Sequence, residues 1–555
     1  MKLDKNNFLL DINKKIIDAL NLIQKNQCGI CFLIKDQKII KSVTDGDIRR
    51  SLISGYKLDD KISKIGNKKF KFIDFNRKLN QDIYDDFKDL KVIPILDKKK
   101  RCQEILSYES LNSLKSSKKK IFILGLGYVG LTLGLILAEN NFEVIGFDNN
   151  KDIRKKLKSK KRTFFENGLQ EYLDNYINKN FKIIDYPEYN ADVHIISVGT
   201  PLKNGTKIPN MQHLKNAIDI VCKNIKKNDL IILRSTVPIG TCRDIVIPLV
   251  EKRTKLKFGK DISISFCPER TVEGLALKEL KFLPQLIGSF DKNSYDQSSK
   301  IFNKYTSVVN LEKIESAEMA KLIDNTFRDA MFGYSNQMAL ISEKFNLNLN
   351  DIIGKINTGY KRNYVPLPSP GVGGPCLSKD PYLLNYSFKK FNLKASMSIE
   401  ARKISDKIVK EVFQSCNKFL KKNNINNLNS KIFISGIAFK GDPETSDIRS
   451  STAIDLIEIF KKRKYKNIYL HDFCTNNAEL REFGKISSNF YSGCSNSNII
   501  IIMNNNKKYL DINLIESLKK IKKPCLIYDS WNVLNPEVIR DMNYITYKSI
   551  GRVTE

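Results

Sequence analysis

The stretch that most constrains the fold is KIFILGLGYVGLTLGLILAENNFEVIGFDNN, at residues 120–150. Its pattern predicts an apolar strand, a glycine turn, a helix and a second apolar strand that ends in an acid. The turn has the spacing G-x-G-x-x-G, and the acid is Asp148. This order is typical of a βαβ unit that binds a dinucleotide; a tight strand-helix turn without a ligand is the alternative.

The same residues indicate which dinucleotide would bind. The three glycines would let backbone N–H groups at the start of the helix approach a pyrophosphate. Asp148 would accept hydrogen bonds from ribose hydroxyls, which favours NAD over NADP. The predicted cofactor residues of this segment are Gly125, Gly127, Tyr128, Val129, Gly130 and Asp148.

Further apolar runs that each end in polar residues follow along the chain: ADVHIISVGTP, DLIILRSTVP and DISISFCPER. Alternating strands and helices predict a parallel sheet with ligands at the carboxyl ends of its strands. A long helix is expected at 313–345. Apolar residues recur along it at helical spacing and predict a buried stripe. They are Met319, Leu322, Ile323, Thr326, Phe327, Ala330, Met331 and Tyr334.

The length of 555 residues predicts several domains. An asparagine-rich break at 421–430 precedes a second α/β unit that begins with KIFISGIAFKGD. Residues 1–115 contain two similar strand-turn-strand segments and are separated from the rest by a polar linker. The expected regions are 1–115, 119–310, 311–420 and 428–555.

Composition excludes several classes of protein. The net charge of +33 is spread along the whole chain, so we expect neither nucleic acid nor a membrane surface as partner, but anionic small molecules such as nucleotides. No apolar run approaches the ~18 residues of a membrane span, and the N-terminus lacks the apolar stretch of a signal peptide, so we expect a cytoplasmic protein. Cys28 and Cys31 form a CxxC without a second ligand pair, and the three histidines are far apart. We therefore expect no metal site.

The segment PSPGVGGPCLSKDPYLL, at 368–384, places one cysteine in a rigid loop. A thiolate becomes a good nucleophile when nearby positive charge lowers its pKa, and Lys379 could supply that charge to Cys376. The glycines of the loop would let a substrate approach the backbone. Asp380 could hold a water or orient the lysine. Composition alone leaves open a loop cysteine without a function.

Two pairs of polar residues have i, i+4 spacing. Glu269 and Glu273 follow a predicted strand and would share one face if their segment were helical. Lys321 and Asn325 lie beside the apolar stripe of the long helix. For each pair a solvated helix face is the alternative.

Six motifs in order give the chain a resemblance to a known family. They are GLGYVG, STVPIGT, CPERTVEG, AKLIDNTF, PGVGGPCLSKD and GIAFKGDPETSDIRSS, and the likeness covers about residues 119–550. The chain resembles the UDP-glucose/GDP-mannose dehydrogenase family, whose members oxidise a nucleotide sugar to its uronic acid. The resemblance implies an α/β fold with two Rossmann-like doubly wound domains joined by a long-helix dimerisation region. A homodimer or larger homo-oligomer is then expected.

The N-terminal region resembles a pair of cystathionine-β-synthase (CBS) repeats, through SVTDGDIRR at 42–50. The likeness implies an adenine nucleotide at Thr44, Asp45 and Asp47. A packing or oligomerisation module is the alternative, because the second repeat is much degraded.

The resemblance also implies a catalytic set: Cys376, Lys321, Asn325, Asp380, Glu273, Glu269 and Thr236. Alcohol to acid is a four-electron oxidation that needs two NAD in succession, and Cys376 would hold the intermediate as a thiohemiacetal and then a thioester. Lys321 and Asn325 would stabilise developing negative charge on oxygen, and Glu273 or Asp380 would act as a base. Glu269 matches a residue near the reacting centre, and Thr236 one that orients water.

By the same likeness, Thr200 and Lys379 join the cofactor residues. Arg362, Lys440 and Arg449 match residues that hold the sugar nucleotide, and cations suit its diphosphate. The expected substrate is a UDP-N-acetylhexosamine, for a surface polysaccharide precursor.

The chain departs from the family pattern at two positions. Pro375 stands where members have histidine or serine, and Arg270 follows Glu269 where UDP-glucose enzymes have phenylalanine. UDP-glucose and GDP-mannose therefore stay open as substrates. A nucleotide-sensing protein without enzymatic activity is the alternative of another class.

Overall fold

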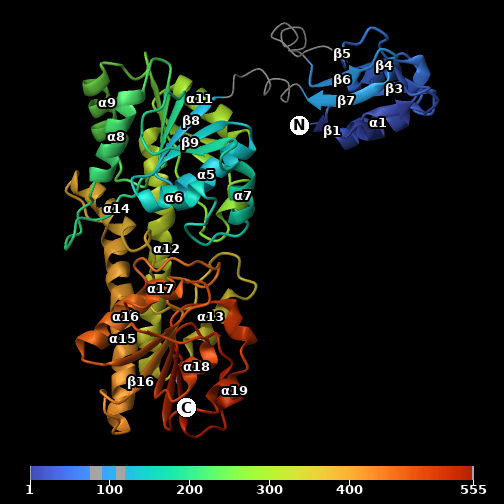
Figure 1. Ribbon diagram of the computed structural model, residues 1–555. Coiled ribbons are helices and arrows are strands. Elements are labelled where there is room, and N and C mark those ends of the chain that lie inside the picture. Colours follow the sequence, from blue (N-terminus) through green and yellow to red (C-terminus); the bar gives the residue numbers. More distant parts are fainter. Residues whose placement is uncertain (1, 76–89, 108–118, 553–555) are drawn as a thin grey trace. The chain divides into compact units, whose positions relative to one another are not determined.

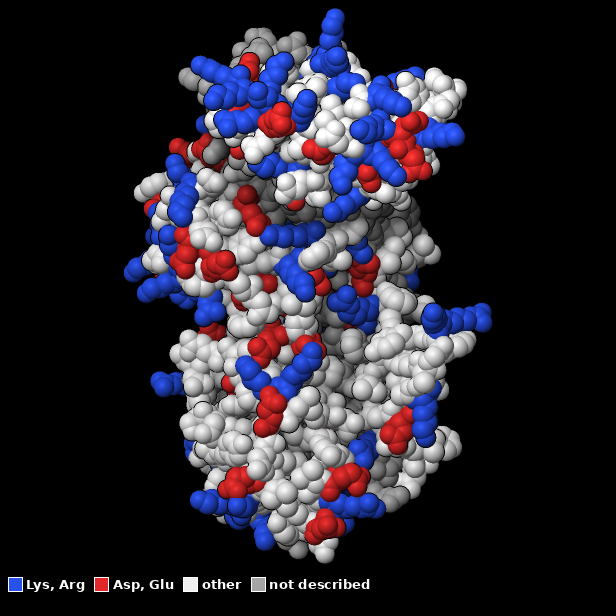
Figure 2. Space-filling model, turned by 90° about the vertical axis from the view of Figure 1, so that its right-hand side faces the viewer, with Lys and Arg blue, Asp and Glu red and all other residues white. Residues whose placement is uncertain are grey.

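The structure, a computed structural model, describes residues 2–75, 90–107 and 119–552 (Figure 1). The chain divides into two compact units, Met1–Lys118 and Lys119–Glu555, and each is described by itself. In the described ranges, no helix has the length and apolar character needed to cross a membrane. On the face drawn in Figure 2, basic side chains are interspersed with acidic ones.

The N-terminal unit contains two small sheets. The first half comprises β2 (Leu9–Asp11), α1 (Ile16–Asn26), β3 (Ile30–Lys35), β4 (Lys38–Thr44) and α2 (Asp45–Ile53). The other sheet comprises β1 (Lys2–Leu3), β5 (Ile73–Asp74), β6 (Val92–Leu96) and β7 (Cys102–Ser107). In both sheets a short strand runs parallel to the first strand of an antiparallel pair, so the strand pattern occurs twice. Cys31 is buried on β3, and Cys28 precedes that strand; both thiols are free.

Helix α2 begins at Asp45, within the SVTDGDIRR segment. The Thr44 hydroxyl accepts the Asp47 N–H at 3.1 Å, and the Asp47 carboxylate accepts the Thr44 N–H at 2.9 Å, which closes a capping box. Arg50 also contacts Asp47, at 2.6 Å. The side chains of Thr44 and Asp47 thus serve the helix end, and nucleotide binding there stays a prediction.

The large unit begins with an eight-stranded sheet. Its strands are β8 (Lys120–Leu124), β9 (Glu143–Phe147), β10 (Phe181–Ile183), β11 (Val193–Ile196), β12 (Leu230–Leu233), β13 (Ser263–Phe266), β14 (Gln285–Ser289) and β15 (Val308–Lys313). They lie in the order β10-β9-β8-β11-β12-β13-β14-β15, and only the β13–β14 pair is antiparallel. The first six strands have the 3-2-1-4-5-6 order of a dinucleotide-binding sheet.

Helices cover both faces of this sheet, because its strands are apolar on both sides. They include α5 (Tyr128–Glu139), α6 (Lys151–Lys158), α7 (Leu169–Tyr176), α8 (Gln212–Asn224), α9 (Ile247–Thr254), α10 (Ala276–Glu279) and α11 (Lys292–Phe302). Two separate apolar clusters result, one with Ile121 and Ile123 and the other with Phe122 and Leu124. Alternate residues of β8 therefore enter opposite cores.

Two long helices join this sheet to the next and run side by side in Figure 1: α12 (Ile314–Ser342) and α15 (Ser396–Lys422). Two shorter ones, α13 (Leu349–Asn357) and α14 (Asp380–Lys389), lie between them in sequence. The predicted buried stripe on α12 is wrong in part. Leu322 and Thr326 are buried, but Met319, Ile323, Phe327 and Tyr334 are exposed, Phe327 at 65%. Helical spacing identifies an apolar face but not whether this chain itself covers it.

The C-terminal sheet is wholly parallel. Its strands are β16 (Lys431–Ser435), β17 (Asn467–His471), β18 (Lys485–Ile486), β19 (Ile499–Ile502), β20 (Cys525–Asp529) and β21 (Ile545–Ser549). Their order, β18-β17-β16-β19-β20-β21, is again 3-2-1-4-5-6. Helices α16 (Thr452–Lys462), α17 (Asn477–Leu480), α18 (Phe490–Cys494) and α19 (Leu514–Leu518) complete this domain.

Candidate active site

The glycine turn after β8 has the shape that a dinucleotide needs. Gly125 has a positive φ of 94°, and its N–H donates to the Phe147 carbonyl at 2.9 Å. A Cβ at Gly130 would lie 1.9 Å from the Gly125 carbonyl oxygen, so only glycine fits there. A Cβ at Gly127 would meet nothing within 4 Å, so this backbone at the start of α5 is open to a ligand.

Asp148 completes the turn. Its carboxylate accepts the Leu126 N–H at 2.8 Å and the Asn150 N–H at 2.9 Å, which fixes its direction at the end of β9. Tyr128 and Val129 form the first turn of α5. These residues fit NAD, with the phosphates at the helix N-terminus and Asp148 at the ribose.

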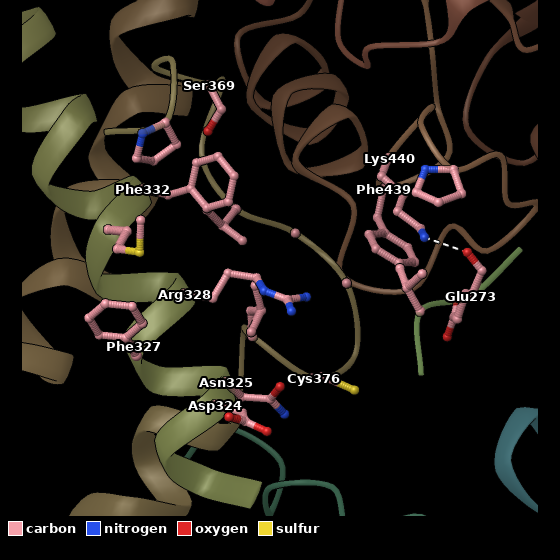
Figure 3. A pocket seen from close by; sticks show the side chains of 18 of the residues that line it. Glu273, Asp324, Asn325, Phe327, Arg328, Phe332, Ser369, Cys376, Phe439 and Lys440 are labelled. Carbon is pink, nitrogen blue, oxygen red and sulfur yellow. Dashed lines mark hydrogen bonds between the residues drawn. The ribbon is translucent and has the colours of Figure 1, made fainter. Parts of the chain in front are cut away.

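A pocket of about 920 Å³ lies between α12, the cysteine loop and the C-terminal domain (Figure 3). Helix α12 contributes Lys321, Asn325 and Arg328, while the loop contributes Cys376. Five of the predicted residues therefore line this pocket: Cys376, Lys321, Asn325, Glu273 and Lys440.

The rigid cysteine loop is pressed against neighbouring backbone. Cβ atoms at Gly371 and Gly373 would lie 2.6 Å from the Ser405 carbonyl oxygen and 2.7 Å from the Ser450 carbonyl oxygen. At Gly374 a Cβ would meet the Phe439 ring at 2.7 Å. These glycines let the loop contact α15 and the C-terminal domain. They also line the pocket, so their role in substrate access stays a prediction.

The thiol of Cys376 is exposed to the pocket, but its environment does not favour the thiolate. Desolvation by the surrounding protein, and then the Asp380 carboxylate, hold the pKa of Cys376 above its ordinary value. Lys379 and Lys321 oppose this shift without reversing it. Lys379 binds Asp380 at 2.6 Å, so much of its charge is compensated. Lys379 lowers the pKa of the thiol as predicted, but not enough to bring it below its ordinary value.

Asn325 lines the pocket near the thiol, and Asp380 lies buried behind it. The Asn325 amide donates to the fully buried Asp380 carboxylate at 2.6 Å. The Asp380 and Lys379 N–H groups donate to the Cys376 carbonyl, at 2.9 and 3.1 Å, at the start of α14. Asp380 therefore orients the Asn325 amide and anchors the cysteine loop. Lys321, one turn before Asn325, is also mostly buried.

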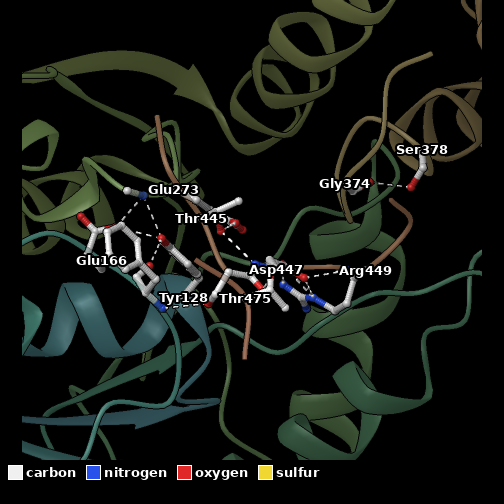
Figure 4. Close-up of polar contacts among 12 residues, drawn as sticks. Tyr128, Glu166, Glu273, Gly374, Ser378, Thr445, Asp447, Arg449 and Thr475 are labelled. Atoms are coloured by element: carbon white, nitrogen blue, oxygen red, sulfur yellow. Dashed lines mark hydrogen bonds and ion pairs between the residues drawn. The ribbon is translucent and has the colours of Figure 1, made fainter. Parts of the chain in front are cut away.

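Glu273 lies on the opposite wall (Figures 3 and 4). The Lys440 ammonium donates to its carbonyl at 2.6 Å, and the Thr445 hydroxyl to its carboxylate at 3.3 Å. Burial, and then the charge of Asp447, raise the pKa of Glu273 to about 7 against the opposing Arg449 and Lys440. A carboxyl with this pKa exchanges protons near neutral pH. Arg449 itself is paired with Asp447 through its Nε, at 2.9 Å.

The other predicted residues lie outside this pocket. Glu269 binds the buried guanidinium of Arg234, and its second oxygen accepts backbone N–H groups. The segment between Glu269 and Glu273 is not helical, so the conditional prediction of a shared face fails. The Thr200 hydroxyl donates to the Thr236 carbonyl, where both follow buried strands of the first sheet. Arg362 is exposed on the loop before Cys376 and does not line the pocket.

The pocket residues outside the predicted set include Arg328, Phe439 and Trp531. Arg328 points into the pocket in Figure 3. It lies three residues after Asn325 on α12, so it shares a helix face with Lys321 and Asn325, and this spacing could have identified it from the sequence. Phe439 and Trp531 come from the C-terminal domain, and the Trp531 indole donates to the Met503 carbonyl at 3.0 Å.

Three family models match the chain. They describe the NAD binding domain, the central domain and the UDP binding domain of the UDP-glucose/GDP-mannose dehydrogenase family, at residues 119–306, 315–407 and 433–536. The chain belongs to this family. The dehydrogenase is accordingly NAD-dependent, and its substrate is a UDP-sugar. A non-enzymatic nucleotide sensor is excluded. Residues before 119 lie outside the three models.

Curated relatives and solved structures agree with this assignment. A UDP-N-acetyl-D-mannosamine dehydrogenase of Campylobacter jejuni is 31% identical over 61% of this chain and 82% of its own length. The enzyme of the same name from Methanocaldococcus jannaschii is 31% identical over 77% and 96%. The structure of the UDP-D-ManNAc dehydrogenase of Pyrococcus horikoshii superimposes with a TM-score of 0.70, at 27% identity over 78% of this chain and 99% of that chain.

Proposed function

We propose that this dehydrogenase oxidises the 6-hydroxymethyl group of a UDP-N-acetylhexosamine to a carboxylate, with two NAD used in succession. The observation that carries the proposal is the Cys376 thiol, which reaches the same pocket as Lys321, Asn325 and Glu273. A simple alcohol dehydrogenase has no need of a nucleophile, whereas a four-electron oxidation needs one to retain the aldehyde.

The first oxidation removes a hydride and a proton from the alcohol. NAD held at the glycine turn and Asp148 would supply the hydride acceptor for both oxidations. Lys321 and Asn325 donate hydrogen bonds to the oxygen of the substrate as it becomes a carbonyl. Glu273 accepts the proton, because its pKa of about 7 leaves much of it ionised at neutral pH. Asp380 fits a positioning role better, since Asn325 and Lys379 occupy its carboxylate.

Cys376 then attacks the aldehyde carbon, and a carbon–sulfur bond forms. Because the surroundings hold the pKa of the thiol above its ordinary value, its proton has to be removed during attack. After Glu273 has released the first proton to solvent, it takes the thiol proton and passes it to the former aldehyde oxygen, which becomes the hydroxyl of the thiohemiacetal. The thiohemiacetal loses a second hydride and its hydroxyl proton to give a thioester. Water attacks this thioester, Cys376 leaves as the thiolate and regains a proton, and the acid is released.

The nucleotide half of the substrate would lie against the C-terminal wall of the pocket. Lys440 lines that wall, and Arg328 faces it from α12, so two cations can meet the two charges of a diphosphate. The preference for an N-acetylhexosamine is supported by the relatives named UDP-N-acetyl-D-mannosamine dehydrogenase. UDP-glucose is the alternative UDP-sugar.

A panel of nucleotide sugars tests the proposal. NADH formed per sugar consumed is measured with UDP-N-acetylmannosamine, UDP-N-acetylglucosamine, UDP-N-acetylgalactosamine, UDP-glucose and GDP-mannose, with and without AMP or ATP. We expect two NADH per UDP-N-acetylhexosamine. The variant Cys376→Ser should lose this turnover and keep NAD binding. One NADH per sugar, or an active Cys376→Ser variant, would refute the mechanism.

We further propose a cytoplasmic homodimer that makes surface polysaccharide precursors. The exposed apolar side chains of α12, which include Ile323 and Phe327, support a second copy as the partner. Light scattering of the wild type and of an Ile323→Glu variant tests this: the variant should be monomeric. The adenine nucleotide proposed for the N-terminal unit is tested by the AMP and ATP arms of the panel.

A further inference from the structure

A buried hydrogen-bond cluster connects the start of α5, within the glycine turn at 125–130 (the cofactor loop), to the loop that carries Glu273 (Figure 4). Its centre is Glu166, which is 2% exposed. The Tyr128 hydroxyl lies 2.9 Å from a Glu166 carboxylate oxygen, and the Gly274 N–H donates to both groups, at 2.8 Å each. The second Glu166 oxygen accepts the Leu277 N–H at 3.3 Å. One carboxylate thus contacts residues on two loops.

Gly274, the residue after Glu273, is held on three sides. Its N–H meets Glu166 and Tyr128, and its carbonyl accepts the Asn167 amide at 2.8 Å. A Cβ on Gly274, which has a φ of 95°, would lie 2.4 Å from the Glu444 carbonyl oxygen of the C-terminal domain. The peptide that follows Glu273 therefore has little freedom to move.

The same cluster reaches the dinucleotide turn. Tyr128 is the first residue of α5 and follows Gly127, whose open backbone fits a phosphate. Its ring stacks on Phe164, with centroids 4.2 Å apart, so the hydroxyl has a fixed direction. A displacement of the turn would therefore be transmitted through the Tyr128 hydroxyl to Gly274.

We infer that Glu166 and Tyr128 are positioning residues that hold Glu273 in place for proton transfer and tie that placement to the cofactor loop. The inference rests on the proposed function, in which Glu273 is the base. A buried carboxylate costs free energy unless its lone pairs are satisfied. Here its partners are the Gly274 and Leu277 N–H groups and the Tyr128 hydroxyl, which also lies 2.8 Å from the Phe165 carbonyl. Removing the charge or the hydroxyl therefore loosens the contact with Gly274 without opening the core.

The expected consequence is a change in the pH dependence of the reaction. Glu273 is surrounded by Lys440, Asp447 and Arg449 of the C-terminal domain, by Tyr128, and by Cys376. Burial is the largest cause of its raised pKa. A looser loop admits water to the carboxyl, and its pKa then falls towards the ordinary value.

The test uses the full chain and the sugar that the panel identifies. Glu166→Gln and Tyr128→Phe are compared with the wild type and with Glu171→Gln, an exposed carboxyl on α7 whose replacement should change nothing. In both variants kcat should fall about tenfold, and its acid limb should move to lower pH by about one unit. The KM for NAD should change less than about threefold, and amides of 270–280 should exchange faster with deuterium.

An unchanged acid limb and kcat in both variants would overturn the inference while leaving the proposed function intact. If Glu166→Gln lowers the thermal midpoint so far that it cannot be assayed, Tyr128→Phe decides alone, because phenylalanine keeps the stacked ring and loses only the hydroxyl. A purely structural role would reduce the amount of active enzyme and leave the acid limb where it is. A wild type that forms no NADH with any sugar would instead refute the proposed function, and the inference with it.

Discussion

The two sheets of the large unit share a strand order, here called the frame, and differ in the length of one loop. Both have the strand order 3-2-1-4-5-6, and in both an aspartate after the second strand accepts backbone N–H groups of the loop after the first strand. Asp148 accepts the Leu126 N–H at 2.8 Å, and Asp472 accepts the Ile437 N–H at 2.7 Å. The following helix, however, begins at Tyr128 in one sheet and only at Thr452 in the other.

Loop length decides what each frame can bind. The short turn leaves open backbone at a helix N-terminus, which suits a dinucleotide. The long loop, residues 436–451, extends to the other domain: Lys440 contacts Glu273, and Ser446 accepts the Phe165 N–H at 3.2 Å. It supplies a cation, Lys440, to the shared pocket instead of a phosphate-binding turn. Two sheets of the same topology thus contribute different features to the site: a dinucleotide turn from the first and a pocket cation from the second.

The comparison predicts its largest effect at Gly130. In Gly130→Ala the new Cβ would overlap the Gly125 carbonyl oxygen, so the turn has to open and NAD binding should weaken at least about 100-fold. Calorimetry with NAD measures this, and UDP binding should persist. Gly354→Ala on α13, where a Cβ meets nothing within 4 Å, is the matched control. Normal NAD affinity in Gly130→Ala would refute the role of the short turn.

The long loop should behave in the opposite way. Lys440→Met removes a pocket cation and its bond to the Glu273 carbonyl, so the KM for the UDP-sugar should rise about 30-fold and kcat should fall. The dissociation constant for NAD should be unchanged. Lys466→Met, an exposed lysine of the same domain, controls for the loss of charge. Weaker NAD binding in Lys440→Met would mean that NAD and the UDP-sugar are not bound separately by the two domains.

The two aspartates that follow the second strand of each sheet should also differ in function. Asp148→Asn should weaken NAD binding about tenfold, because a ribose hydroxyl loses a charged acceptor. Asp472→Asn should leave NAD binding unchanged and cost about 1–3 kcal/mol of stability, since Asp472 accepts four backbone N–H groups. Calorimetry with NAD and the thermal midpoints of both variants distinguish the two cases. Equal effects on NAD would show that the aspartates do not differ in function.

What the sequence could predict follows from how local each feature is. The strand, turn, helix and Asp148 lie within one short stretch, so residue spacing alone identifies the cofactor turn. The position of Lys321 and Asn325 on one helix face follows from the helical repeat in the same way. The exposure of Phe327 could not be predicted from the helical repeat, because periodicity identifies an apolar face but not what covers it.

Features made by contacts between distant residues were beyond the sequence pattern. Glu166 bonds with partners 38 and 108 positions away along the chain, and nothing in its own segment marks it. Glu269 meets Arg234, which follows a neighbouring strand, so the charge of Glu269 is already neutralised. The pKa of Cys376 depends on burial and on the Lys379–Asp380 pair, which cannot be weighed before the fold is known.

The smallest expected effect lies in the electrostatics of the long loop. Glu273 has to be ionised to accept a proton, so with a pKa of about 7 the rate should rise as the pH increases from about 6 to 8. Asp447 raises this pKa, and Arg449 lowers it. In Asp447→Asn a negative charge disappears and Arg449 loses its partner, so both changes favour the ionised form. The acid limb of the kcat profile should therefore move to lower pH by about half a unit. A limb that moves to higher pH, or stays in place, would mean that a group other than Glu273 controls the rate, and the long loop would then bind substrate without tuning its base.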